Sequence, residues 1–354
     1  MSTKILFLGA TGWSLLWVAG YVGGTVLDGI LSHPKASQFE ITTYIRSADK
    51  GKKVEALGLG LKAVSGGFDA VEEAAAKADI IFNCASSDDV KLNEAVLRGA
   101  KKAFATTKVP VKIIHTSGSA IVADMAMGQF GIEKAVDDAD EATLNALPIT
   151  AFHRNVDMPL ADAEKDGYVK AYVIAPPLIY GLASGRFVDA GLQNPVPTGI
   201  LLSARVAIER GSFAQAGPAK NIWSTVEIHD IANLELQIFN SVLEGKTIAS
   251  GSAYYTGVDG DIVMGDLFKE IAAALHANGK IKSPEPTELT QEEFGKWPVL
   301  VGFGVNSRMT DSRSRGLGWK PTHKSPQDFI SGIKETVRVF AGQSEQFGGN
   351  WTPM

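Results

Sequence analysis

Residues 4–12, Lys-Ile-Leu-Phe-Leu-Gly-Ala-Thr-Gly, decide the fold expected of this chain. The run up to Leu8 is short and mostly apolar, as in a strand that is buried in a parallel sheet. Glycines after such a strand let the backbone turn sharply and approach a pyrophosphate, whose charge the N-terminus of the next helix can meet. The stretch therefore predicts a strand–turn–helix unit with a dinucleotide site at Gly9, Thr11 and Gly12.

Strands and helices alternate over the first half of the chain. Alternation requires crossover connections, which produce a parallel sheet with ligands at the carboxyl ends of its strands. The pattern predicts strands over 4–8, 39–45, 61–64, 79–85, 111–115 and 168–174, with helices from the first turn to about residue 32 and over 71–77, 93–105 and 158–165. The polar run 46–50 is expected to be a loop.

Regularity falls after residue 181. The segment 181–217 is rich in Gly, Pro and Ser, which is typical either of a segment that covers a substrate or of a plain connection. A strand over 222–228 and helices over 231–243, 265–275 and 325–340 follow. The fold class is thus α/β: a doubly wound parallel-sheet Rossmann domain over 1–180 and a smaller C-terminal substrate lobe over 181–354, with some elements returning to the sheet.

Composition narrows the function classes. The 354 residues carry a formal net charge of -5, with both signs mixed along the chain, so no basic stripe suits nucleic acid. The single cysteine, Cys84, allows no intrachain disulfide and favours a reducing compartment. The N-terminus lacks the pattern of a secretion signal, so a cytoplasmic location is expected.

One apolar stretch, residues 13–31, is about long enough to cross a bilayer. Its glycines at 20, 23, 24 and 29, and the strand expected just before it, favour a buried helix of the sheet instead. No membrane partner is expected.

The glycine-rich turn carries a family resemblance. Gly9-Ala-Thr-Gly12, together with Tyr21-Val-Gly-Gly24, resembles the extended and atypical short-chain dehydrogenase/reductases, in which the two halves are contiguous. Here residues 13–20, Trp-Ser-Leu-Leu-Trp-Val-Ala-Gly, separate them. An erroneous gene model, a tolerated insertion and a changed cofactor site all explain this insertion. If it is genuine, the helix should begin near Gly20, with Gly23 in its first turn.

The resemblance extends over nearly the whole chain. Residues 223–232, 306–309 and 317–321 resemble segments of the extended members, and the sequence is similar to a fungal-type branch related to nucleoside-diphosphate-sugar epimerases and NmrA-like regulators. In that context His229 and Asp230 favour a structural role.

The cofactor expected is NADP(H), with NAD(H) possible. Arg46, followed by Ser47, comes directly after the second strand, where a guanidinium suits the 2′-phosphate of NADP, and Lys50 can help. An ordinary solvated arginine explains Arg46 as well. Ala85 and Ser86, at the end of the fourth strand, resemble the segment of small residues that lies along the cofactor in this superfamily.

The resemblance implies a catalytic serine and a Tyr-x-x-x-Lys motif, but the tyrosine of this motif is missing from the place where it is expected. Ser117 or Ser119 is placed to hold a substrate oxygen, although capping the loop explains a serine there equally well. Where Tyr-x-x-x-Lys should fall, the chain has His153 and Asp157, a helical i, i+4 pair in which Asp157 can orient an imidazole acid–base group. A helix-start pair without chemistry is the alternative, and Tyr168 and Tyr180 are further candidates.

Other chemistries fit less well. The histidines are scattered without ligand spacing, so no metal is expected, and the chain has no Gly-x-Ser-x-Gly elbow of a hydrolase. We therefore expect an NADP(H)-dependent oxidoreductase acting on a small carbonyl or alcohol substrate. The alternatives are a non-catalytic NAD(P)-binding redox sensor of the NmrA-like type and a sugar-nucleotide epimerase or isomerase.

Overall fold

The computed structural model describes residues 2–11, 20–323 and 326–342. Within these ranges a seven-stranded sheet is built from parallel pairs only. From one edge to the other its strands are β11 (Tyr254–Tyr255), β7 (Val169–Ile174), β5 (Val111–Thr116), β4 (Ile80–Asn83), β1 (Thr3–Leu8), β2 (Phe39–Tyr44) and β3 (Lys62–Val64). All six strands predicted for the first half are present.

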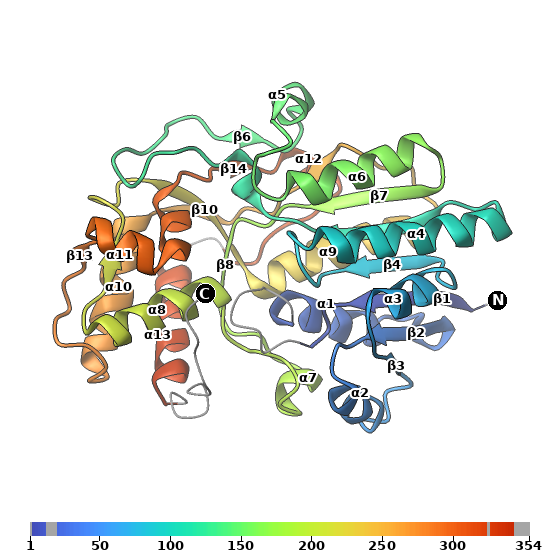
Figure 1. The fold of residues 1–354 in the computed structure, drawn as a ribbon, viewed down its shortest axis with the longest axis horizontal. Helices are drawn as coiled ribbons and strands as arrows, with labels where there is room; N and C mark the ends of the chain where they lie inside the picture. The colour runs from blue at the N-terminus through green and yellow to red at the C-terminus, as the bar shows by residue number, and fades with distance from the viewer. Residues whose placement is uncertain (1, 12–19, 324–325, 343–354) are drawn as a thin grey trace.

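Helices cover both faces of this sheet (Figure 1). Ile5 and Phe7 of β1 pack in one core with helices α1 (Tyr21–Leu31) and α9 (Ile228–Leu243). Leu6 and Leu8 point to the other face and pack with α3 (Phe68–Ala75), α4 (Val90–Thr107) and α6 (Arg154–Lys165). The predicted doubly wound Rossmann class is confirmed. The chain reverses direction across the sheet at β1, so the crevice beyond the ends of β1 and β4 is where such folds bind ligands.

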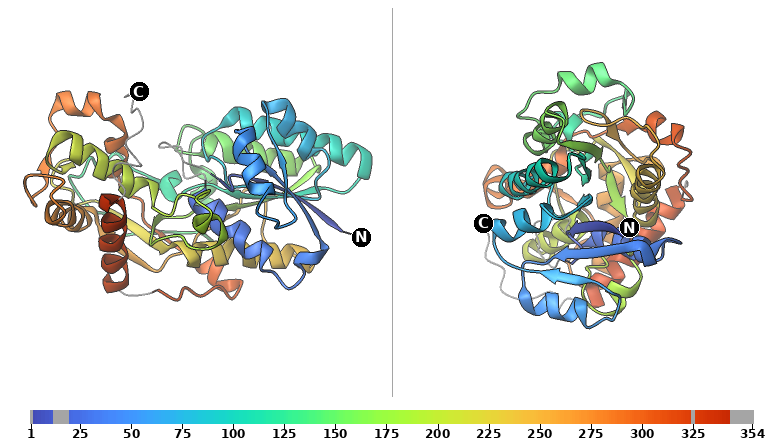
Figure 2. Two further views of the ribbon diagram at one scale, coloured as in Figure 1. Left: turned by 90° about the horizontal axis from the view of Figure 1, so that it is seen from below. Right: turned by 90° about the vertical axis from the view of Figure 1, so that its right-hand side faces the viewer.

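A smaller lobe lies beside the sheet, at the left of Figure 1 and again in the left view of Figure 2. Its sheet has the order β12 (Gly260–Val263), β10 (Ile222–Glu227), β8 (Leu178–Tyr180). Helices α8 (Thr198–Arg210), α10 (Met264–Ala277) and α13 (Pro326–Gly342) share a third hydrophobic core with it. Two elements from this half, β11 and α9, return to the large sheet, and the division at residue 180 stays a prediction.

The remaining elements are short. They are α2 (Ala48–Glu55), α5 (Glu141–Ala146), α7 (Arg186–Asp189), α11 (Gln291–Lys296), α12 (Ser312–Gly316), the 3-10 turns η1 (Ala36–Gln38), η2 (Ser119–Val122) and η3 (Pro298–Gly304), and the paired strands β6 (Val136–Asp137) with β14 (Met309–Thr310) and β9 (Ala214–Gln215) with β13 (Thr287–Glu288).

Two expectations about local structure were wrong. The polar run 46–50 is only partly a loop, because the Ser47 hydroxyl accepts a hydrogen bond from the backbone N–H of Lys50 and so caps helix α2. The segment 181–217 contains the 13-residue helix α8, whose mainly buried side chains supply the packing that its sequence pattern did not reveal.

The insertion at 13–20 lies, except for Gly20, outside the described residues, as does Gly12. Helix α1 begins directly after Gly20, as expected of a genuine insertion. Over the described part of the chain, no helix combines the length and the apolar character that crossing a membrane requires.

Candidate active site

The turn after β1 is built from close backbone contacts. Gly9 has a φ of 91°, and a Cβ atom there would lie 2.4 Å from the carbonyl group of Cys84 at the end of β4. A Cβ on Gly23 would lie 2.3 Å from the carbonyl oxygen of Gly9. Both positions therefore need glycine, and helix α1 starts directly against the strand ends, which is the arrangement a bound pyrophosphate requires.

A cavity of about 530 Å³ opens beyond the ends of β1, β2 and β4. We call it the adenosine-side cavity; its lining is Gly9, Thr11, residues 44–46, 66–68, 85–86 and 88–92. Arg46 lines it, as expected, whereas Ser47 is used in capping α2. Partial burial, and then the charges of Arg46 and Lys53, lower the pKa of Lys50, so an anion bound here would relieve a local excess of positive charge.

Phe68 was missed by sequence reasoning. It is 38 % exposed and lines the adenosine-side cavity from the start of α3. An exposed aromatic ring at the end of a strand–turn is a platform on which a flat base can stack. The signal was present in the sequence as an aromatic residue directly after Gly66-Gly67.

A second cavity, of about 270 Å³, shares the lining residues Ala85, Ser86 and Asp88 with the first. We call it the central cavity. One wall comes from the ends of β4 and β5 with His153, and the facing wall from the smaller lobe. The lining consists of Tyr21, residues 84–88, 116–118, His153, 176–179, 197–199, Trp223 and Phe303.

His153 stands at the head of α6 and is held by Asp88. The ring Nδ1 lies 2.7 Å from the Asp88 carboxylate. Burial opposes ionisation of Asp88, but hydrogen bonds from His153 and Ser87 hold its pKa below the ordinary value. An ionised carboxylate can only accept, so Nδ1 carries a proton, and in the neutral ring Nε2, which lies beside Gly118 in the cavity wall, keeps its lone pair.

The expected pairing of His153 with Asp157 was wrong. His153 is the N-cap residue of α6 and has a φ of 65°, so its side chain does not follow the helical i, i+4 spacing, although its carbonyl accepts the backbone N–H of Asp157. Asp157 instead accepts hydrogen bonds from the Ser117 hydroxyl at 2.8 Å and the Tyr254 hydroxyl at 3.0 Å. Its other oxygen lies 3.4 Å from Nε2 of His115.

These contacts belong to a buried polar network behind the central cavity. Arg154 donates to the Tyr254 hydroxyl at 2.9 Å, and Nδ1 of His115 lies 3.2 Å from the Asn83 carbonyl oxygen. Burial, and then the Asp157 charge, raise the pKa of Tyr254 above its ordinary value. Because the Ser117 proton is used on Asp157, the serine oxygen presents lone pairs, and no proton, to the cavity.

The other candidates lie elsewhere. Ser119 is buried and shares a 2.6 Å hydrogen bond with Ser307, so it has a packing role and does not line the central cavity. Tyr168 directly precedes β7, whose opposite end approaches the cavity, and its ring contacts Lys101. Tyr180 donates to Asp259 in the smaller lobe.

A buried carboxyl beneath the central cavity was also missed. Glu235 of α9 is fully buried and accepts hydrogen bonds from Thr116 at 2.8 Å and Cys84 at 3.6 Å. Burial raises its pKa from 4.5 to about 7. The signal was an acidic residue within the apolar stripe of an amphipathic helix.

This shift predicts a pH-dependent stability. A carboxyl whose pKa is raised in the folded state stabilises the fold fully at a pH below the pKa that it has in the unfolded chain. This stabilisation is lost as the pH rises through about 7. Glu235→Gln removes this loss. Measured by urea denaturation, the free energy of unfolding of the variant relative to that of the native protein should therefore rise by about 2 kcal/mol between pH 5 and pH 8.5. For Glu94→Gln, at an exposed position of α4, the difference in free energy of unfolding from the native protein should not change with pH. A difference that is likewise independent of pH for Glu235→Gln would contradict the raised pKa of Glu235.

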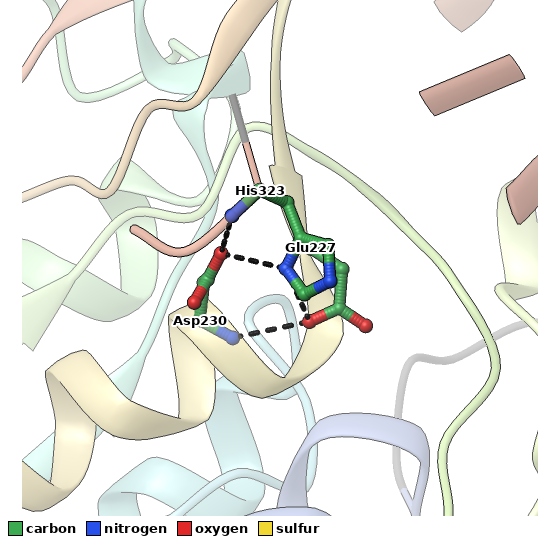
Figure 3. Close-up of side chains that lie close together, drawn as sticks. All are labelled: Glu227, Asp230 and His323. Carbon is green, nitrogen blue, oxygen red and sulfur yellow. Dashed lines mark hydrogen bonds and ion pairs between the residues drawn. The ribbon is translucent and has the colours of Figure 1, made fainter. Parts of the chain in front are cut away.

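One group of side chains in the described ranges has ligand atoms close enough to hold an ion: Glu227, Asp230 and His323, all within 4.8 Å (Figure 3). Each carboxylate already has donors. Glu227 accepts from the backbone N–H groups of His229 and Asp230 and so caps α9, while Asp230 accepts from the backbone and ring of His323. The cluster therefore fastens the segment after α12 to α9, in keeping with the structural role expected of Asp230.

No protein-family profile and no curated protein matches this sequence. Solved structures match it over nearly its whole length. A dTDP-glucose 4,6-dehydratase from Bacillus anthracis, in complex with NAD, has a TM-score of 0.62 at 14 % identity and covers 98 % of both chains. A UDP-glucose 4-epimerase from Thermotoga maritima has a TM-score of 0.60 at 15 % identity, covering 97 % of this chain and 100 % of that one.

A UDP-glucuronic acid 4-epimerase from Bacillus cereus, in complex with UDP-glucuronic acid and NAD, also matches. Its TM-score is 0.60 at 14 % identity, and the match covers 96 % of this chain and 100 % of that one. The chain thus has the fold of the extended short-chain dehydrogenase/reductases. The resemblance read from the glycine-rich turn is confirmed as a likeness of fold.

Proposed function

We propose that this chain is an NAD(P)(H)-dependent oxidoreductase that acts on a small carbonyl or alcohol substrate in the central cavity. The observation that carries the proposal is the His153–Asp88 pair, because His153 lines a cavity that shares Ala85, Ser86 and Asp88 with the adenosine-side cavity. Binding of dinucleotides by solved proteins of the same fold supports it.

The described residues fit a dinucleotide. Gly9 and Gly23 let the turn after β1, the end of β4 and the start of α1 approach one another closely, which brings the N-terminus of α1 to the strand ends. Phe68 offers a face for adenine, and Arg46 with Lys50 offers charge for a 2′-phosphate, which favours NADP(H). When bound, the nicotinamide supplies or accepts the hydride.

The chain's own residues handle the proton. In alcohol oxidation, Nε2 of His153 takes the hydroxyl proton, and Asp88 stabilises the imidazolium that forms. In carbonyl reduction, the imidazolium returns that proton to the carbonyl oxygen. The Ser117 hydroxyl donates to Asp157, so it supplies no proton to the substrate in either direction.

A second candidate, nucleotide-sugar epimerase or isomerase chemistry, is favoured by the whole-chain likeness to two epimerases. A non-catalytic redox sensor is the third, favoured by the absence of Tyr-x-x-x-Lys where the resemblance places it. Titration of the purified chain with NADPH and NADH, followed by nicotinamide fluorescence, tests what all three share. Turnover of simple ketones then separates the oxidoreductase from the other two.

The insertion makes a second form of the protein informative. A variant without residues 13–20 should bind the dinucleotides no more than about threefold differently if the full chain accommodates the insertion. Binding only after the deletion would show that the insertion blocks the site. Failure of both forms to bind either dinucleotide would overturn the proposal.

The proposed preference for NADP(H) depends on Arg46. Replacing Arg46 by Ala should weaken NADPH binding by about tenfold or more, because a charge-assisted hydrogen bond contributes about 1.5–3 kcal/mol, and should leave NADH binding nearly unchanged. Lys52→Ala removes an exposed charge from α2 outside the cavity lining and serves as the control. Equal losses for the two dinucleotides would refute the preference.

A further inference from the structure

The facing wall of the central cavity is apolar. It is contributed by β8 and the two prolines before it, the start of α8, β10 and η3. Its members are Pro176, Pro177, Leu178, Ile179, Pro197, Thr198, Gly199, Trp223 and Phe303. Thr198 is the one residue in this group with a polar side chain other than the Trp223 indole, so the wall offers contact area and few hydrogen bonds.

The two aromatic rings of this wall are fixed in place. The Trp223 indole N–H donates to the Val305 carbonyl at 2.7 Å, which uses its only donor. The Phe303 ring lies over Gly199, where a Cβ atom would be 3.3 Å from it. Both rings are therefore preorganised to receive an apolar group, at little cost in side-chain entropy.

Apart from the ring of His153, the described lining of the central cavity offers no cationic partner for an anion. None of its described lining residues is a lysine or an arginine, and its carboxylate, Asp88, is used on His153. Arginines of the smaller lobe are paired elsewhere, Arg210 with Glu293 and Arg308 with Asp261. A diphosphate entering this cavity would lose its hydration without the charge-assisted hydrogen bonds that replace it.

We propose that the central cavity binds an uncharged carbonyl compound with an apolar, preferably aromatic, body that contacts Trp223 and Phe303, and that it does not bind a nucleotide sugar. This inference rests on the proposed function, because the carbonyl oxygen is directed to His153. It narrows that function to a class of substrate. It also separates this chain from the nucleotide-sugar enzymes that share its fold.

Saturation-transfer NMR on the full chain with NADP⁺ tests the substrate class. The probes are 4-methylacetophenone, its charged analogue 4-acetylbenzoate, and UDP-glucose. We expect the neutral ketone to bind at least tenfold more tightly than the other two. Equal or tighter binding of 4-acetylbenzoate or UDP-glucose would overturn the proposal.

Two variants test the location. Phe303→Ala and Trp223→Leu should each weaken binding of the ketone by about tenfold and leave dinucleotide binding unchanged. Phe130→Ala, which removes a half-exposed phenylalanine outside the cavity, is the matched control. Ketone binding that neither variant weakens would place the site elsewhere and refute the proposal. If the ketone binds at this wall but is never reduced, the oxidoreductase proposal fails while the binding inference stands.

Discussion

Replacing His153 by Ala is expected to lower kcat/KM for a ketone by about 10²- to 10⁴-fold, the range that a general acid–base group contributes. The dinucleotide should still bind with unchanged affinity, because His153 lines the central cavity and not the adenosine-side cavity. Steady-state kinetics and a fluorescence titration on the same preparation separate the two effects.

Asp88→Asn refines this test. An amide can still contact Nδ1 but cannot stabilise the imidazolium, so kcat should fall and the pH profile should move, with a smaller loss than in His153→Ala. His276→Ala, exposed on α10, is the control for removing a histidine. Turnover that survives in His153→Ala would remove the acid–base role from His153.

The fold could be predicted because its signals are local. The strand 4–8 and the strands expected near 80 and 112 are apolar runs bounded by turn residues, and each is found in the sheet. Helix α8 was missed because it is mostly buried, so its sequence lacks the clear stripe of a surface helix. Helices α10 and α13 of the same lobe were predicted, because their apolar stripes are clear in the sequence.

The site was predicted less well because its contacts are not local. Asp88 and His153 are 65 residues apart, and the helical spacing that suggested Asp157 as partner fails at a residue with a left-handed backbone. Such a conformation is strained in a non-glycine residue and is found often at functional sites. Glu235 and Phe303 come from elements that reach the site only through the tertiary fold.

The buried network has a part in stability that is distinct from its part in chemistry. Arg154 is 2 % and Asp157 3 % exposed, and Tyr254 connects them. Two opposite charges can be buried together when hydrogen bonds connect them. Removal of one charge leaves the other buried without an opposite charge. The network therefore connects α6 to β11 behind Ser117, and it directs the hydroxyl proton of Ser117 to Asp157.

Replacing Asp157 by Ala should accordingly lower the free energy of unfolding by about 3–5 kcal/mol, as measured by urea denaturation with an unchanged slope. Asp162→Ala, on the same helix but exposed, should cost less than about 0.5 kcal/mol. Asp157→Asn, which keeps the shape and one acceptor, should fall between them, and in that variant Ser117 can donate to the cavity. A loss below about 1 kcal/mol in Asp157→Ala would mean that Arg154 is compensated by other groups, and that Asp157 serves Ser117 alone.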